Sequence, residues 1–214
     1  MYLPSAFEER RPDVLQALIA SHPLGLLVTQ SADGELSANS IPFMLEADPA
    51  GGPGILRAHV ARANPVWREA RTDRDALVVF QGAQAYVSPS FYPTKAETGK
   101  VVPTWNYVMV QARGPLRTVE EAPWLHALVT RLTERHEADR PQPWAVGDAP
   151  ADYVATMLRA IVGIELPLVA LVGKWKVSQN RNDADRAGVA EGLRRDGTAD
   201  AVAIAAELAR RVSG

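Results

Sequence analysis

The stretch "LGLLVTQSADGELSANSIPFMLE", Leu24 to Glu46, decides the fold class. Its first seven residues form an apolar run with the length of a strand. Asp33 and Gly34 follow, and an Asp-Gly pair between two strand-like runs is a strong signal for a β-hairpin. Pro42 in the second run lacks an N–H donor, which predicts a sheet edge or a bulge there. We therefore expect an antiparallel hairpin at this point.

Strand-like segments recur at short intervals, and amphipathic helices separate or follow them. Further strands are expected in residues 55–61, in a second hairpin around Gly82 (76–88), in residues 104–119 and in residues 163–180. Helices are expected in residues 12–21, 66–71, 124–132 and 153–161, and two more follow Asn182, the last capped by Thr198. This pattern predicts a mainly β, α+β fold, in which six or seven antiparallel strands form a partly open barrel with helices on its ends.

We expect one large domain. Residues 1–181 should form the barrel with its inserted helices, because strand signals continue to that point. After Asn182 the composition shifts to Ala, Asp, Arg and Gly, and residues 182–214 should form a helical tail that packs on the same domain.

The composition excludes several classes of site. The 214 residues include no cysteine, so disulfide scaffolds, thiolate metal sites and cysteine nucleophiles are excluded. Lys+Arg 23 and Asp+Glu 25 give a net charge of −2, which provides no global attraction to nucleic acid or to an anionic membrane. There is no signal-peptide pattern and no apolar run of transmembrane length, so a cytoplasmic protein is expected.

The sequence assigns no metal site and no catalytic residue. No two of the four histidines stand at helical metal-binding spacing. Ser88 and Ser90 lack the glycine-flanked elbow of a hydrolase nucleophile. Neither a dinucleotide-binding glycine motif nor a P-loop is present.

Three clusters do suggest a ligand. The first is "RAHVARANP", in which Arg62 and Asn64 stand where a strand turns into a helix. A helix N-terminus with an arginine beside it can bind an anion. The simpler alternative, which the local sequence favours, is that Asn64 caps the helix and Arg62 is solvated.

The second cluster is "GKWKVSQNR". Lys174 and Lys176 alternate with Trp175 and Val177, so one face of this strand should be cationic and the other apolar. An edge strand guarded by lysines is the alternative. The stretch ends with Gln179 to Arg181, which offer more hydrogen-bond donors than are needed to protect an edge strand from pairing.

The third cluster is "AYVSPSFYPTK", Ala85 to Lys95, which we call the lip. Two prolines end the strand there and stiffen the chain. Donors are expected from Ser88, Ser90, Tyr92, Thr94 and Lys95, and flat rings from Phe91, Tyr92 and Trp105. Donors and rings together suit a ribityl-phosphate cofactor, whereas a structured loop at the rim of the core is the alternative.

The sequence resembles the PaiB family of FMN-binding negative transcriptional regulators, within the FMN-binding split-barrel superfamily. A family-like start, "MYLPSAFEE", is followed by six blocks in family order: "HPLGLLVT", "ANSIPF", "HVARANPVW", "VVFQGAQAYVSPSFYPTK", "VPTWNYV" and "KVSQNR". Phe91 stands where the family pattern suggests tryptophan. Gln111 stands where it suggests histidine, so Gln111 is not taken as a ligand.

The resemblance implies a six-stranded antiparallel split barrel that acts as a homodimer and holds FMN between its subunits. It suggests Arg62, Asn64 and Lys95 as phosphate ligands. The ring would lie near Asn39, Ser40, His59, Tyr92 and Trp105, with Ser88 among the donors of the lip. The partner's C-terminal strand, including Lys176, Gln179 and Arg181, would close the pocket.

Three hypotheses about function follow. The first is a flavin-binding protein that acts as a small-molecule oxidoreductase, or as a negative regulator linked to a metabolite. The second is a transcriptional regulator that acts through DNA or a protein partner without redox chemistry, although the charge balance argues against direct DNA binding. The third is a haem-binding split barrel with His59 as the axial ligand.

Overall fold

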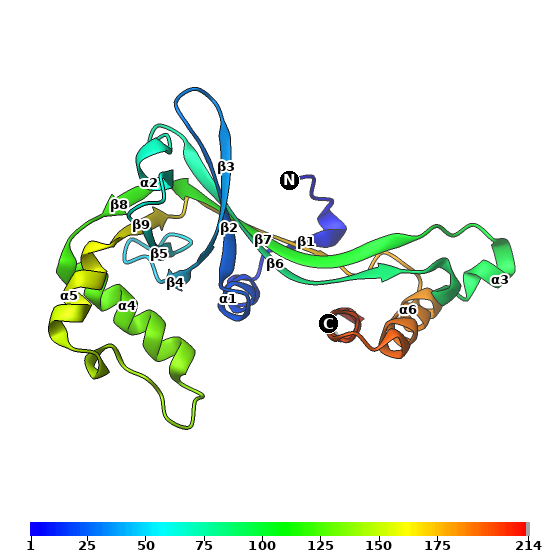
Figure 1. The fold of residues 1–214 in the computed structure, drawn as a ribbon. Coiled ribbons are helices and arrows are strands. Elements are labelled where there is room, and N and C mark those ends of the chain that lie inside the picture. The colour runs from blue at the N-terminus through cyan, green and yellow to red at the C-terminus, as the bar shows by residue number, and fades with distance from the viewer. Residues whose placement is uncertain (213–214) are drawn as a thin grey trace. The chain divides into compact units, whose positions relative to one another are not determined.

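The computed structural model describes residues 1–212, which form seven α-helices and ten strands (Figure 1). The strands are β1 (Glu8–Glu9), β2 (Leu24–Gln30), β3 (Leu36–Pro42), β4 (Met44–Glu46), β5 (Ile55–Ala61), β6 (Asp75–Val87), β7 (Thr104–Pro115), β8 (Arg117–Val119), β9 (Ile161–Pro167) and β10 (Ala170–Lys176). The helices are α1 (Pro12–Ser21), α2 (Val66–Glu69), α3 (Thr94–Thr98), α4 (Ala122–Glu137), α5 (Ala151–Arg159), α6 (Asp183–Asp196) and α7 (Ala199–Val212).

The strands form two antiparallel sheets. One has six strands in the order β1-β10-β7-β6-β2-β3, and the other has four in the order β4-β5-β9-β8. The predicted α+β class with antiparallel pairing is confirmed. The described residues contain more strands than the six or seven expected, because three of the expected strands are each divided between the sheets and β1 was not expected. No helix among them is long and apolar enough to cross a membrane.

The chain divides into two compact units, which we describe separately. Unit 1 comprises Met1–Leu18, Gln81–Val110 and the residues from Val172 onward, and unit 2 comprises Ile19–Phe80 and Gln111–Leu171. Strands β6 and β7 contribute residues to both units. The tail helices α6 and α7 belong to unit 1 and contact each other closely.

The hairpin predicted from residues 24–46 is confirmed in unit 2, but its second strand ends at Pro42, and Met44–Glu46 form a separate strand of the other sheet. Strands β2 and β3 pair antiparallel with Leu27 opposite Asn39, and Gly34 in the turn has a φ of 94°. Pro42 is the last residue of β3, which is an edge strand, so its missing N–H leaves no ladder bond unmade. The chain then enters the second sheet, where β4 pairs with β5.

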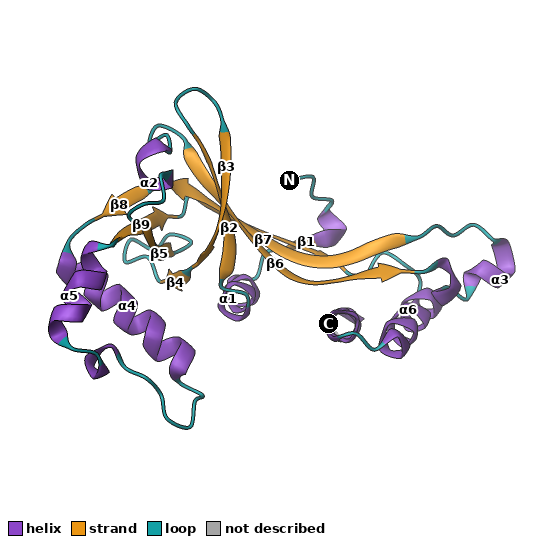
Figure 2. Ribbon diagram, viewed as in Figure 1, coloured by secondary structure: helices purple, strands orange, loops and turns teal. Residues whose placement is uncertain are grey.

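The hairpin predicted around Gly82 is wrong. Strand β6 runs without interruption from Asp75 to Val87 (Figure 2). A Cβ at Gly82 would lie 2.7 Å from side-chain carbons of Leu18 and of Val108. The glycine therefore permits close packing on the strand and does not make a turn.

The single strand predicted over residues 163–180 is also wrong. Strand β9 lies in the four-stranded sheet and β10 in the six-stranded sheet. Between them, the backbone N–H of Leu168 bonds to Gly54 O at 2.9 Å, and that of Val169 bonds to Arg113 O at 2.8 Å. These long-range bonds divide an apolar run that shows no local break.

Helix α4 packs on the four-stranded sheet of unit 2. Its buried residues include Leu128 and Leu132, which pack with Met44 of β4 and with the partly buried Trp124. Because Met44 lies opposite Arg57, helix α4 covers the face of β5 that carries Arg57.

In unit 1 the predicted cap of α7 is confirmed, since Thr198 Oγ1 accepts the N–H of Ala201 at 3.2 Å.

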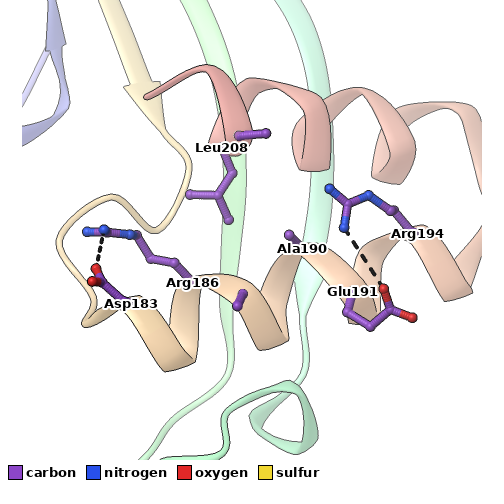
Figure 3. A pocket seen from close by; sticks show the side chains of 8 residues that line it. Asp183, Arg186, Ala190, Glu191, Arg194 and Leu208 are labelled. Carbon is purple, nitrogen blue, oxygen red and sulfur yellow. Dashed lines mark hydrogen bonds and ion pairs between the residues drawn. The ribbon is translucent and has the colours of Figure 1, made fainter. Parts of the chain in front are cut away.

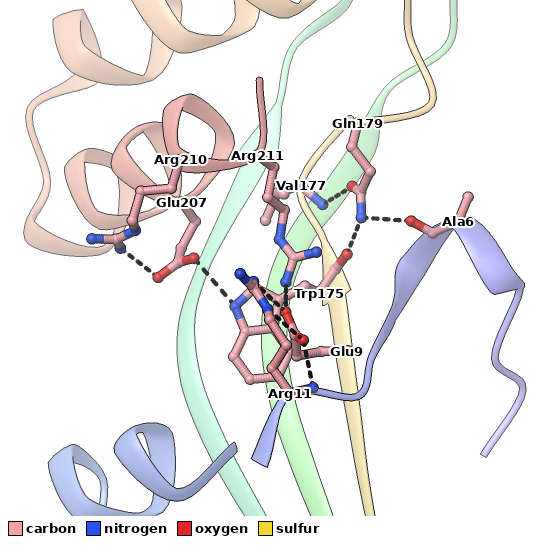
Figure 4. Close-up of polar contacts among 9 residues, drawn as sticks. All are labelled: Ala6, Glu9, Arg11, Trp175, Val177, Gln179, Glu207, Arg210 and Arg211. Carbon is pink, nitrogen blue, oxygen red and sulfur yellow. Dashed lines mark hydrogen bonds and ion pairs between the residues drawn. The ribbon is translucent and has the colours of Figure 1, made fainter. Parts of the chain in front are cut away.

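A buried carboxylate joins the N-terminal strand to the last helix in unit 1 (Figure 4). Glu9 accepts hydrogen bonds from the side chains of Arg11 and Arg211. The Arg211 guanidinium also lies over the ring of Trp175, 5.7 Å from its centroid, and Trp175 Nε1 donates to Glu207 at 3.2 Å. Every charged group in this network has a partner, so the buried charge is compensated.

The pKa of Glu9 reflects this network. Burial raises the pKa, but the hydrogen bonds from Arg11 and the positive charges of Arg211 and Arg11 outweigh it and lower the pKa to about 2. A carboxylate with a lowered pKa stabilises the fold above its unfolded pKa of 4.5. That stabilisation should be lost as the pH falls from about 4.5 to about 2.

Replacing Arg211 should destabilise the protein. We expect Arg211→Ala to lower the free energy of unfolding by roughly 1.5–3 kcal/mol, because a charge-assisted bond to a buried carboxylate is lost. Arg210→Ala is the matched control, since Arg210 pairs with Glu207 at the surface, and it should cost less than about 1 kcal/mol. Denaturant unfolding measures both values. Equal losses would contradict a special role for the buried pair.

Candidate functional site

The residues predicted for the ligand site lie in both units. Unit 2 contains Asn39, Ser40, His59, Arg62 and Asn64. Unit 1 contains Ser88, Tyr92, Lys95, Trp105, Lys176, Gln179 and Arg181. We consider the two groups in turn.

The guanidinium of Arg62 bonds to protein groups of unit 2 through all three of its nitrogens. Nε donates to Arg159 O at 2.8 Å, Nη2 donates to Ile161 O at 3.2 Å, and Nη1 pairs with Glu120 at 2.5 Å. The side chain therefore holds the end of α5 and the start of β9. It is not simply solvated, as the alternative interpretation supposed. Its role as a phosphate ligand stays a prediction.

Asn64 caps the short helix that follows it. Its Oδ1 accepts the N–H of Val66 at 3.0 Å, and its Nδ2 donates to Asn39 Oδ1 at 3.0 Å. Asn39 in turn donates to Ser37 at 3.1 Å. Helix α2 has only four residues, so its end supplies a weak dipole for an anion. Ser40 is exposed on β3.

His59 is half-buried on β5, on the face that α4 covers. It lies opposite Gly163, where a Cβ would come within 2.3 Å of the Trp124 ring. The buried Nδ1 of His59 has no hydrogen-bond partner among residues 1–212. Burial lowers the pKa of this imidazole, so it should be neutral at physiological pH.

In unit 1 the lip is fastened to helix α6. Thr94 Oγ1 donates to the buried carboxylate of Asp185, with both oxygens at 2.9 Å, and the Thr94 N–H bonds to the same group at 3.3 Å. A Cβ at Gly192 would lie 2.4 Å from the Phe91 ring, so this ring packs directly on α6. Tyr92 is only 2% exposed. These two rings fill the rim of the core.

The other residues of the lip differ in exposure. Ser88 caps the turn that follows it, because its Oγ accepts the N–H of Ser90 at 3.2 Å. Lys95 is exposed on α3. The alternative interpretation, a structured loop, therefore accounts for Phe91 and Tyr92.

The predicted two-faced character of β10 is confirmed. Trp175 and Val177 are buried on the side of Arg211 and α7. On the opposite face, Lys174 Nζ donates to Tyr2 O at 2.9 Å, and Lys176 Nζ donates to Thr104 Oγ1 and Trp105 O, each at 2.5 Å.

Lys174, Lys176 and Arg181 form what we call the cationic cluster. Burial is the largest cause that lowers the pKa of Lys176, and the positive charges of Lys174 and Arg181 lower it further. The three charges are therefore near one another. None of them makes an ion pair within the described part of the chain.

Aromatic rings lie beside the cationic cluster. Trp105 is 53% exposed and meets Tyr86, which is 47% exposed, edge to face at 6.2 Å between ring centroids. Lys174 Nζ lies 5.4 Å from the ring centroid of Tyr107 and 5.6 Å from that of Tyr2. Tyr2, Tyr86 and Tyr107 were not predicted as site residues. The alternation of β7, with Asn106 and Val108 buried, could have identified Tyr107.

The donor-rich end of β10 is a turn and not a continued strand. Ser178 has a φ of 66°, and its Oγ exchanges hydrogen bonds with the buried Asn106 side chain at 2.9 and 3.2 Å. The Gln179 amide bonds to Val177 N and Ala6 O, each at 2.8 Å, so its polar atoms are already engaged. The Arg181 guanidinium lies 5.1 Å from the Tyr92 ring centroid.

Two pockets occur in unit 1. One, of about 770 Å³, lies beside Tyr86 and Trp105 and reaches the turn between α6 and α7 at Thr198. The other, of about 560 Å³, lies between α6 and α7 (Figure 3). Its charged residues are paired with one another, since Arg186 bonds to Asp183 and Arg194 lies 3.9 Å from Glu191.

Residues 1–169 match a family model described as "Putative FMN-binding domain". The chain belongs to this family. An "uncharacterized protein" of Emericella nidulans is 36% identical, and the alignment covers 92% of each chain. "Protease synthase and sporulation protein PAI 2" of Bacillus subtilis is 29% identical and covers 92% of this chain and 90% of its own. The resemblance to the PaiB family is thereby confirmed.

Solved structures agree on the fold. The "FAD and Heme binding protein" from Mycobacterium smegmatis superposes with a TM-score of 0.59 at 18% identity, covering 86% of this chain and 80% of its own. The "Flavocytochrome Anf3" from Azotobacter vinelandii gives 0.56 at 13% identity, covering 85% and 75%. The split-barrel fold is confirmed, and at these identities the likeness shows the fold alone.

The bond between Thr94 and Asp185 should hold the lip in place. We expect Thr94→Val to lower the free energy of unfolding by roughly 1–3 kcal/mol, because a buried carboxylate loses a donor. Amide hydrogen exchange in residues 88–98 should also become faster.

Thr98→Val is the matched control, since the exposed Thr98 hydroxyl donates to Thr94 O at 3.1 Å and accepts the Lys100 N–H at 3.2 Å, and touches no buried carboxylate. It should change either measurement little. Unchanged exchange in Thr94→Val would show that the lip is held by packing alone.

Proposed function

We propose that this protein binds FMN on the open face of unit 1, beside Trp105 and the cationic cluster, and uses it as an oxidoreductase for a small molecule. One observation carries the proposal: three cations without a carboxylate partner lie next to aromatic rings, of which Tyr2 is exposed. The family match, which names an FMN-binding domain, supports it.

The residues fit the chemistry of this cofactor. An isoalloxazine ring requires a flat surface, which Trp105 and Tyr107 offer at the sheet face. A phosphate requires positive donors, which Lys176 and Arg181 offer. The polar contacts of Gln179 lie within the protein, so we assign it a supporting role and no direct contact with flavin.

When bound, FMN supplies the hydride or electron transfer, and the protein binds and orients it. The chain's own contribution is a rigid sheet face backed by buried Trp175 and Val177. We assign no acid or base residue. A metabolite-linked negative regulator remains the related alternative, in which the same redox step changes the level of a signalling metabolite.

Haem is the second candidate cofactor, since one structural neighbour is named a haem-binding protein and another a flavocytochrome. His59 would be its ligand, and the unpartnered Nδ1 supports that idea. However, His59 lies on the sheet face that α4 covers, so access would require α4 to move. The absorption spectrum distinguishes the cofactors, because haem gives a single intense Soret band and oxidised flavin gives two separate bands in the near-ultraviolet and the blue.

Replacing Trp105 should weaken flavin binding. We expect the protein to bind FMN saturably, and Trp105→Leu to weaken both FMN and riboflavin about tenfold, because a stacking surface for the ring is lost. Quenching of flavin fluorescence during titration measures the affinity.

Trp144→Leu is the matched control, because Trp144 is a similarly exposed indole in unit 2. It should leave flavin binding unchanged. If the wild-type protein binds haem and no flavin, the FMN proposal fails and the haem hypothesis replaces it.

We also propose that the protein is a homodimer. Unit 2 exposes an apolar sheet face made by Leu24, Leu26 and Val28 of β2 with their neighbours Ala38 on β3 and Val79 on β6. Leu24 is 62% exposed and Leu26 is 40% exposed. An apolar sheet face of this kind is expensive to leave in water and suits a second copy of the chain.

A charge on this face should separate the subunits. We expect the wild-type protein to sediment at twice the 23.2 kDa chain mass and Leu26→Lys to sediment as a monomer. Val202→Lys is the control, since Val202 is an exposed apolar residue on α7, outside this face. A wild-type monomer at every concentration would contradict the dimer.

A further inference from the structure

Most arginines in the described chain already bond to carboxylates or carbonyls of the protein itself. Arg57 pairs with Glu46 at 2.5 Å and with Glu165 at 2.9 Å. Arg62 and Arg186 also bond to carboxylates and backbone carbonyls. An anion would have to displace these protein partners to reach the guanidinium groups.

The cationic cluster is different, because it retains unused donors. Lys176 uses two of its three ammonium donors on Thr104 and Trp105, and Lys174 uses one on Tyr2. The Arg181 guanidinium makes no hydrogen bond within residues 1–212 and lies only over the Tyr92 ring. A tetrahedral phosphate has several acceptor oxygens for such donors.

The acidic residue paired with Lys174 in the sheet does not neutralise this cluster. Glu8 lies directly opposite Lys174 in the pairing of β1 with β10. Its carboxylate bonds to Arg10 at 2.7 Å and not to Lys174. Three nearby cations therefore repel one another without compensation in the described protein. Such an arrangement is typical of a site completed by an anionic ligand.

Backbone strain provides an independent observation at the same place. Ser178 adopts a positive φ, which is costly for a residue with a side chain. The buried Asn106 holds it through two hydrogen bonds, and the Arg181 N–H bonds to Ser178 O at 3.0 Å. The strained turn that follows β10 thus fixes the position of the Arg181 backbone.

We infer that Lys174, Lys176 and Arg181 form a phosphate-binding seat, which holds the phosphate group of FMN. The inference rests on the proposed flavin binding. It replaces the predicted phosphate ligands Arg62 and Asn64, whose polar atoms have protein partners, with residues at the end of β10.

The test compares FMN with riboflavin, which lacks the phosphate. Calorimetry should show that Lys176→Gln and Arg181→Gln each weaken FMN about tenfold and change riboflavin by less than about twofold. Arg181→Lys, which keeps the charge, should retain most of the FMN affinity. Lys100→Gln is the matched control, since Lys100 is an exposed lysine of the same unit. A thermal melt confirms that each variant is folded.

Two outcomes would overturn the inference while flavin binding stands. One is an equal loss of FMN and riboflavin in the Lys176 and Arg181 variants, or no loss of either. The other is a selective loss of FMN in Arg62→Gln, which would place the phosphate in unit 2.

If the wild-type protein binds neither flavin, the proposed function fails and the seat is tested with inorganic phosphate. A rise in melting temperature with phosphate, relative to chloride at equal ionic strength, should be absent in Lys176→Gln and Arg181→Gln. A rise of this kind would support a seat for another phosphate ester. The absence of any rise in the wild-type protein would overturn the seat.

Discussion

The alternation of side chains along β10 is the constraint on which unit 1 depends. One face sends Trp175 and Val177 into the core, where Trp175 meets Arg211 and Glu207 of the last helix. The other face sends Lys174 toward the Tyr107 ring and Lys176 toward the backbone carbonyl of Trp105. A shift of one residue in register would place two ammonium groups in the core and an indole at the surface. The tail helices therefore fix which face remains open for a ligand.

The two faces treat buried charge in opposite ways. Glu9 is buried among arginines and has its charge fully compensated, which is consistent with a role in folding. Lys174 is almost as buried, yet its amine meets only a carbonyl and two rings. The repulsion between these cations destabilises the unliganded fold. A bound anion would remove this repulsion, and the free energy gained would add to the affinity for the anion. The contrast separates a structural network on one face of the β1–β10 pair from the proposed binding site on the other.

Much of the fold follows from local signals, whereas the errors come from distant contacts. The Asp33-Gly34 turn and the Thr198 cap were predictable because the residues that decide them are neighbours in sequence. Gly82 was mistaken for a turn, because a glycine also serves close packing and only Leu18 and Val108 show which applies.

The site divides in the same way. Lys176 and Arg181 were predicted from the alternation and the donors of the local sequence, and their role at a ligand site stays a prediction. The engagement of Arg62 was not, since its carbonyl partners lie 97 and 99 residues away. Tyr107 was missed although the alternation of β7 places it opposite the buried Asn106 and Val108. Ser178 adopts a strained backbone conformation that a buried amide holds in place. An ordinary strand end does not require such strain. Its cost is understandable if the turn exists to aim Arg181 beside Lys176, where their charges act on the same ligand.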